Sequence, residues 1–270
     1  MQLKKSLLSL ALAGVVAVSS TALVGCVSNT TSNSSTTDRA QLMLVSEQEV
    51  MTQSAQAYDE VIAQAKAQGV LNTNKALTAR VKKIGNRLIA KAPSFRADCA
   101  QWDWEVNVIT SKELNAWCMA GGKIAVYTAL VEQLKLNDDE IATVMGHEIA
   151  HALREHVREQ MSTQALKQGA LNIASLFGVS NTTLNIANTL AEVGVSLPFS
   201  RSHETEADEL GLELMYKAGY DPQKGIKIWE KMMSLGSGNT GLAVLLSTHP
   251  ADDERLANLT ELAAQLKAGK

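Results

Sequence analysis

Hydrophobic positions that recur at helical spacing run through most of this chain and predict a mostly helical fold. Ser46 begins a capping-box pattern, S-E-Q-E, which predicts the start of a helix. Further along, Val81, Ile84, Leu88 and Ile89 share one helical face, and Pro93 ends that helix. Helices are predicted over residues 46–67, 74–91, 128–136, 137–162, 202–218, 222–235 and 251–268, the last with Leu256, Leu259, Leu262 and Leu266 along one stripe.

Two segments have the two-residue alternation of β-strands instead. Residues 102–110 alternate Trp102, Trp104, Val106 and Val108 with polar neighbours. Gly121-Gly122 predicts a turn into a second strand over residues 123–127. The overall pattern therefore predicts an α+β fold that is mostly helical and has a small β-sheet.

An uncharged stretch, residues 168–191, has the length of a membrane span. It contains Asn172, Asn181, Asn185 and Asn188 together with several Ser and Thr residues. Such polar groups make burial in a bilayer costly. We therefore interpret this stretch as packed helices.

The N-terminus has the pattern of a secretory signal. Lys4 and Lys5 precede a segment, residues 6–25, that carries no charge and is rich in Leu, Ala and Val. The segment ends in Leu23-Val24-Gly25-Cys26, which resembles a bacterial lipobox. The alternative is a transmembrane anchor, but the apolar core is short and no stop-transfer charges follow it.

This interpretation divides the chain into three parts. Residues 1–25 form a cleaved lipoprotein signal peptide, and residues 26–37 comprise the lipidated Cys26 and a flexible Ser/Thr/Asn-rich tether. Residues 38–270 form the folded domain. By resemblance to known lipoproteins, Val27 carries no inner-membrane retention signal, which implies the periplasmic side of the outer membrane.

Composition excludes several classes of protein. With 46% hydrophobic residues and a formal net charge of −3, the chain is too apolar and too weakly charged to be disordered throughout. Three cysteines in 270 residues exclude a disulfide-scaffold miniprotein. Removal of residues 1–25 takes away two lysines and no acidic residue, so the mature charge is about −5 and nucleic-acid binding is not expected.

Two cysteines besides Cys26 leave two possibilities. In an oxidising periplasm Cys99 and Cys118 can form a disulfide, which we favour, or they can be two buried free thiols. The spacing of the two residues in the sequence does not decide between these states.

The chemistry is concentrated in His147-Glu148-Ile149-Ala150-His151, an H-E-x-x-H pattern on a predicted helix. Residues four apart are separated by about 40° around a helix, so His147 and His151 can bind one zinc ion. Glu148 is placed to act as general base. His156 falls about 180° from His147 on a continuous helix and is expected to face away.

Zinc needs a third protein ligand, and the segment S-R-S-H-E-T-E-A-D at residues 200–208 offers candidates. Glu204 and Asp208 share a helix face, so Glu204 can bind zinc while Asp208 orients a ligand histidine. His203 is the rival third ligand. Glu206 lies about 200° from Glu204 and is expected to point elsewhere.

These motifs together resemble the gluzincin metallopeptidase family that includes the HtpX heat-shock protease and the CAAX prenyl protease. The resemblance rests on G-H-E-x-x-H at residues 146–151, S-R-x-x-E-x-x-A-D at 200–208 and His249-Pro250, with Asn115-Ala116, Gly121-Gly122 and A-G-Y-D-P at 218–222 in support. With the lipobox, the chain is most similar to the soluble periplasmic lipoprotein branch, of the LoiP type. The resemblance covers about residues 45–265 and implies a zincin-like fold with the sheet beside the H-E-x-x-H helix.

The resemblance also implies roles for individual residues. One zinc ion per chain is bound by His147, His151 and Glu204, with Glu148 as base and Asp208 behind the ligands. The substrate docks as an added strand at an edge formed by residues 121–127, with Gly121, Gly122, Ile124 and Val126 in contact. His249 is the first candidate for a second oxyanion donor and Arg201 the next. In some relatives a histidine at the position of His249 occupies the metal in a latent state, so His249 is also a candidate gate.

The function we expect is a zinc endopeptidase that is lipid-anchored to the inner leaflet of the outer membrane and cleaves unfolded or misassembled envelope proteins. Extended or misfolded polypeptides are its expected partners. One alternative is a lipoprotein chaperone or assembly factor that uses the same groove with little proteolysis. Another is hydrolysis of cell-wall amide bonds by similar metal chemistry. The sequence pattern does not determine the physiological substrate, the oligomeric state or whether the site is latent.

Overall fold

A computed structural model describes residues 27–32, 39–176, 199–235, 249 and 253–269 of the chain, without the side chains of 27, 168–176 and 235. The predicted signal peptide, residues 1–25, and Cys26 lie outside the described residues. Most of the uncharged stretch at 168–191 does too, with only its start described, as part of a helix that ends at Leu176. In the described part of the chain no helix is both long and apolar enough to span a membrane.

The fold contains a three-stranded β-sheet. The strands are β3 (Glu105–Ile109), β4 (Ala116–Met119) and β5 (Lys123–Tyr127), in the order β3-β5-β4. β5 pairs in parallel with β3 and antiparallel with β4. The strand predicted over 123–127 is confirmed, but it is the central strand and not an edge. β4, which the alternation of residues did not reveal, forms the edge on one side.

The other predicted strand begins later than expected, at Glu105 and not at Trp102. The backbone N–H of Trp102 donates to the carbonyl of Cys99, and that of Trp104 donates to Trp102, so both tryptophans belong to a turn. The Trp104 ring lies against Gly122, whose φ is +82°, and a Cβ at Gly122 would come within 2.5 Å of that ring. The alternation at 102–104 therefore reflects packing against the Gly121-Gly122 turn and not strand pairing.

Helices α2 (Glu47–Ala67) and α3 (Lys75–Ile89) confirm the two predicted N-terminal helices. Each begins at its predicted start with a capped N-terminus, because Ser46 accepts from the N–H of Glu49 and Asn74 accepts from that of Leu77. The predicted apolar face of α3 is buried, with Val81, Ile84 and Leu88 at most 1% exposed. The chain then passes through short 3₁₀ turns at Ala92–Ser94 and Ala97–Gln101, and the predicted helix after β5 is α4 (Thr128–Gln133).

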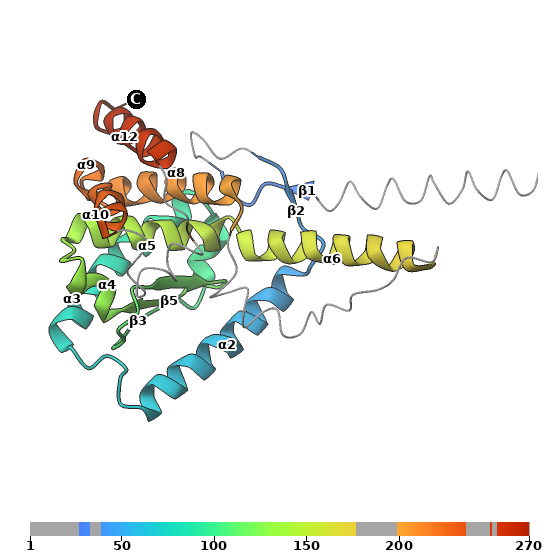
Figure 1. Cartoon of the computed structure of the whole chain (residues 1–270), viewed down its shortest axis with the longest axis horizontal. Helices are drawn as coiled ribbons and strands as arrows, with labels where there is room; N and C mark the ends of the chain where they lie inside the picture. Colours follow the sequence, from blue (N-terminus) through green and yellow to red (C-terminus); the bar gives the residue numbers. More distant parts are fainter. Residues whose placement is uncertain (1–26, 33–38, 177–198, 236–248, 250–252, 270) are drawn as a thin grey trace, which may run out of the picture.

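Helix α5 (Asp138–Leu153) lies between the sheet and α8 (Arg201–Lys217), as Figure 1 shows. Its start is the predicted one, with a full capping box between Asn137 and Glu140. The two helices approach closely where Gly146 faces Gly211: a Cβ on Gly211 would come within 2.7 Å of the backbone nitrogen of His147. Because backbone atoms on both sides form this contact, neither position can accept a side chain without separating α5 from α8.

The single helix predicted over 137–162 is wrong, because α5 ends at Leu153 and a new helix, α6 (His156–Leu176), begins at His156. Glu155 between them has φ of 51°, which lies in the left-handed region. The guanidinium of Arg96 donates to the Leu153 carbonyl and to the Glu155 carboxylate. Arg96 therefore takes the carbonyl that a continuous helix would use, and the chain changes direction.

The C-terminal part forms α9 (Pro222–Gly225), α10 (Lys227–Leu235) and α12 (Asp253–Lys267). The predicted helix over 222–235 is thus two helices with a break at Ile226. Asp221 caps α9 and Pro222 occupies its first turn. The predicted stripe on α12 is confirmed, since Leu259 and Leu262 are buried and Leu256 and Leu266 pack against the same core.

The predicted flexible tether is wrong for residues 27–32, which pack against the folded domain. β1 (Val27–Ser28) pairs with β2 (Gln41–Leu42), and these strands lie beside the end of α5 and the start of α6 (Figure 1). The side chains of Asn29 and Thr31 accept hydrogen bonds from Arg154. A polar segment can pack here because a buried arginine provides its donors. Residues 33–38 lie outside the described part.

The favoured disulfide is not formed, because Cys99 and Cys118 are both free thiols in the structure. Cys99 belongs to the 3₁₀ turn Ala97–Gln101 and is fully buried in the core, whereas Cys118 belongs to β4 and lines a cleft beside Glu148. The two thiols therefore lie in different environments, one in the core and one at the cleft. Burial raises the pKa of the Cys99 thiol to about 11.

Candidate metal centre

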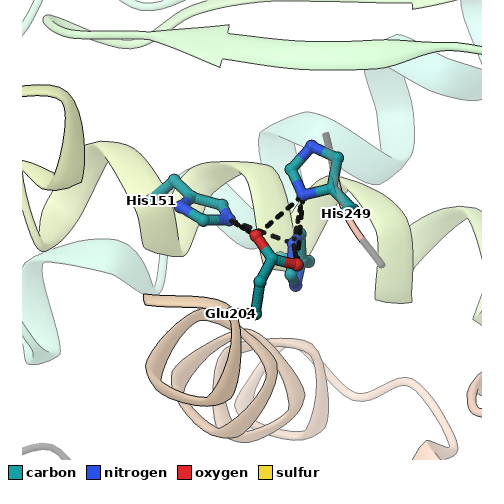
Figure 2. A group of neighbouring side chains, drawn as sticks. His151, Glu204 and His249 are labelled. Carbon is teal, nitrogen blue, oxygen red and sulfur yellow. Dashed lines mark hydrogen bonds and ion pairs between the residues drawn. The ribbon is translucent and has the colours of Figure 1, made fainter. Parts of the chain in front are cut away.

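Four side chains converge at the contact between α5 and α8. His147 and His151 come from one face of α5, Glu204 from the first turns of α8, and His249 from the segment before α12. Their donor atoms all lie within 4.8 Å of one another, and all four residues are buried. Figure 2 shows His151, Glu204 and His249 pointing at one another from three different parts of the chain.

The spacing of these atoms fits zinc. His147 Nε2 lies 3.1 Å from both His151 Nε2 and His249 Nδ1. Glu204 Oε1 lies 3.3 Å from His151 Nε2 and 3.1 Å from His249 Nδ1. Four donors placed 2.0–2.1 Å from one zinc ion in a tetrahedron would be about 3.3 Å apart. Nitrogen and carboxylate donors at this spacing are therefore suited to a single zinc ion.

Asp208 lies where the sequence predicted it, behind His147. Its Oδ1 is 2.9 Å from His147 Nδ1, so the imidazole donates to the carboxylate and turns its Nε2 toward the other donors. Asp208 follows Glu204 by one helical turn. Helix α8 therefore supplies both the carboxylate of the donor group, Glu204, and the carboxylate that orients His147.

The sequence did not reveal Arg255, a buried residue of α12 that joins the two carboxylates of α8. It donates to Asp208 through Nε and Nη2, at 2.7 and 2.9 Å, and its Nη1 lies 2.9 Å from Glu204 Oε2. Its guanidinium also stacks over Trp229, 4.4 Å from the ring centroid. No local motif marks this arginine, because its role depends on α12 crossing α8.

His156 contradicts the expectation that it faces away from the metal donors, whereas Glu206 points away from Glu204, as expected, and contacts none of the four donors. His156 Nδ1 lies 2.9 Å from His151 Nδ1, and His156 Nε2 lies 3.1 Å from Glu206 Oε2. The prediction assumed one continuous helix, whereas the break at residues 154–155 returns His156 to the same side as His151. Burial lowers the pKa of His156 to about 4, so its imidazole is neutral near pH 7.

The other candidates from the segment at 200–208 lie outside the donor group. His203 is buried and its Nε2 is 3.2 Å from Glu159, so this rival third ligand is occupied elsewhere. Both His156 and His203 are buried, with 0% and 7% of their surface exposed. Arg201, a candidate oxyanion donor, is exposed at the start of α8.

Glu148 lies beside the donor group without belonging to it. Its Oε1 is 3.6 Å from His249 Nε2. Burial raises the pKa of Glu148, which brings it closer to neutrality and suits a group that takes up and returns a proton. Burial alone would lower the pKa of His249, but Glu148 and Glu204 outweigh that effect and raise it.

A cleft opens directly onto Glu148, His151 and His249. Its wall includes Asn115, Ala116, Trp117, Cys118 and Ala120 of β4 and its ends, together with Trp102 and Phe199. The strand edge beside the metal donors is therefore β4 and not residues 121–127. Gly122, Ile124 and Val126 are buried, and Ile124 and Val126 pair with strands on both sides, so this segment does not form the predicted strand edge.

Comparison with known proteins agrees with this arrangement. The chain is 31% identical over 240 residues to the mitochondrial metalloendopeptidase OMA1 of Saccharomyces cerevisiae, covering 83% of this chain and 66% of that protein. It is 27% identical to the beta-barrel assembly-enhancing protease of Escherichia coli, covering 80% and 45%, and 28% identical to metalloprotease YcaL of the same species, covering 73% and 77%. The chain spans 30–66% of the length of the three OMA1 relatives.

The family profile covers the parts of the chain that build the donor group. Residues 75–263 match peptidase family M48, and this range includes α3, the sheet, α5, α8 and most of α12. The mostly helical structure with its three-stranded sheet beside the H-E-x-x-H helix is the zincin-like fold expected from the sequence. On the family match and the convergent donors, the chain belongs to peptidase family M48.

Proposed function

We propose that this chain is a zinc-dependent endopeptidase that cleaves extended or misfolded polypeptides of the bacterial envelope. The observation that carries the proposal is the placement of Glu148, a buried base beside four convergent donors and at the wall of an open cleft. The relatives named metalloendopeptidase, protease and metalloprotease support the same reaction class.

The residues of this chain divide the work of peptide hydrolysis. His147, His151 and Glu204 would hold zinc, which when bound activates water and polarises a peptide carbonyl. Glu148 takes the proton released by water and returns it to the nitrogen of the leaving amine. Asp208 orients His147 of α5, and Arg255 holds Glu204 of α8 in place.

The edge of β4 suits an extended substrate. Its inner side pairs with β5, and no strand among the described residues pairs with its outer side. A peptide in extended conformation can add to such an edge through main-chain hydrogen bonds, which requires little of its sequence but does require that it be unfolded. This supports unfolded or misassembled proteins as the substrate class.

The position of His249 indicates that the site also has a latent state. With His249 the group offers four donors, which would occupy every position of a tetrahedral zinc ion, whereas catalytic zinc sites keep one position open for water. We infer that the structure is a latent form and that His249 must leave before cleavage. The same closed arrangement supports the alternative function, a chaperone or assembly factor that binds polypeptides with little turnover.

Digestion assays separate these functions from cell-wall hydrolysis. The purified zinc-loaded protein is expected to cleave casein, an unfolded protein, and to leave purified peptidoglycan intact. Release of soluble fragments is measured for both substrates in parallel. Cleavage of peptidoglycan but not casein would contradict the endopeptidase proposal, and binding of casein without fragments would favour the chaperone.

We propose further that the protein belongs to the soluble periplasmic lipoprotein branch, of the LoiP type, and is anchored by Cys26 to the inner leaflet of the outer membrane. The lipobox-like Leu23-Val24-Gly25-Cys26 supports this location. A Cys26→Ser change is expected to release the protein into the soluble periplasmic fraction, because one lipid-bearing residue provides the anchor. Density-gradient fractionation checks this, and equal outer-membrane recovery of both forms would contradict it.

A further inference from the structure

We infer that His156 and Glu206 form a positioning chain for the metal ligand His151, and that Arg39, from the segment before α2, holds the end of this chain. The inference rests on the proposed zinc peptidase function. It assigns a role to three buried or half-buried residues that bind neither substrate nor metal.

The direction of each hydrogen bond follows from the metal site. His151 Nε2 faces the other donors, so it must offer a lone pair and its proton must be on Nδ1. His151 Nδ1 lies 2.9 Å from His156 Nδ1, which can then only accept. The proton of His156 is therefore on Nε2, 3.1 Å from Glu206 Oε2, where a carboxylate accepts it.

The two ligand histidines are thus supported in two different ways. His147 donates directly to the carboxylate of Asp208. His151 reaches a carboxylate only through the intervening imidazole of His156. Such outer hydrogen bonds fix the ring orientation and tautomer of a metal ligand and increase its basicity.

Glu206 is held from two sides by arginines. Arg154, which is 0% exposed, donates to its Oε2 at 2.9 Å, and Arg39 Nε donates to its Oε1. Arg39 also reaches Glu159 through both of its terminal nitrogens. Arg39 of the N-terminal segment therefore ends the hydrogen-bonded chain that starts at His151.

A neighbouring pair of residues provides a natural control. His203 stacks on His156 with ring centroids 4.4 Å apart, and it bonds to Glu159 just as His156 bonds to Glu206. Both carboxylates have 9% exposed side chains and both bind Arg39. The two pairs share burial and charge, but only His156 touches a metal ligand.

The test is zinc affinity, measured on the full mature protein by competition with a chromophoric chelator. His156→Phe keeps the ring and removes both hydrogen bonds, so zinc binding is expected to weaken roughly 10- to 100-fold. His203→Phe makes the same change one ring further away and is expected to leave zinc affinity at the wild-type value. His156→Asn restores an acceptor near the position of Nδ1 and is expected to recover most of the affinity.

A second matched pair covers the case in which His156→Phe does not fold. Glu206→Gln is expected to weaken zinc binding more than Glu159→Gln, with thermal unfolding of the metal-free proteins measured for both. Equal affinities within either pair would overturn the inference, because a general effect on the cluster would not distinguish its two halves. Failure of the wild-type protein to bind zinc would instead contradict the proposed function.

Discussion

Substitution of Glu148 by glutamine is expected to abolish cleavage of casein while zinc and polypeptide binding persist. Glutamine has nearly the same shape but cannot take up the proton from water. General acid–base catalysis contributes about 10²- to 10⁴-fold to a rate, and a loss of at least this size is expected. Zinc binding persists because Glu148 is not among the four donor residues. Fragment release, zinc content and casein binding are the three measurements.

Glu204→Gln is the matched control, since it makes the same chemical change on a donor. It is expected to weaken zinc binding on the order of 10²-fold or more, because one ligand of the site is lost. Asp208 continues to pair with Arg255, so the guanidinium keeps one carboxylate partner. If Glu148→Gln cleaves casein at the wild-type rate, another group must be the base. Equal zinc content in Glu204→Gln and wild type would show that the third ligand is a residue other than Glu204.

Substitution of His249 by alanine is expected to increase cleavage. In the structure His249 Nδ1 lies 3.1 Å from both His147 Nε2 and Glu204 Oε1, so it fills the position that substrate and water need. If the open state is populated at roughly 0.1–10%, removal of the fourth donor raises the rate about tenfold or more. The initial rate of casein cleavage by the zinc-loaded variant is the measurement, beside wild type at equal zinc content.

The sign of the effect distinguishes the two roles considered for His249. As a gate, His249 limits access, so its removal raises kcat. As an oxyanion donor, it stabilises the transition state, and its removal lowers kcat with little change in KM. Binding of zinc by the variant is the control, because His147, His151 and Glu204 still provide three ligands. A fall in kcat would contradict the latent state.

Much of the local structure could be predicted from the sequence because it depends on neighbouring residues. Ser46, Asn74 and Asn137 cap their helices within one turn, and all three helices begin at the predicted positions. The approach of His147 to His151 also follows from helical geometry alone, since residues four apart share a face.

The sequence-based predictions failed where contacts between residues far apart in the sequence determine the structure. Arg96 takes the Leu153 carbonyl and ends α5, which brings His156 to His151 although helical spacing placed it on the far side. Pairing on both sides makes β5 the central strand, so the exposed edge beside the cleft belongs to β4. Buried Arg154 orders a polar segment that was expected to be a free tether.

The sequence by itself determined the candidates for metal ligands and base, because H-E-x-x-H and the Glu204/Asp208 pair are each local patterns on one helix. Only the tertiary structure decided how these helices meet, through the backbone contact at Gly146 and Gly211. It also decided which side chains stand behind the ligands. Arg255 and His156 reach the site from separate helices, and the hydrogen bonds that give them their roles form only when those helices have packed.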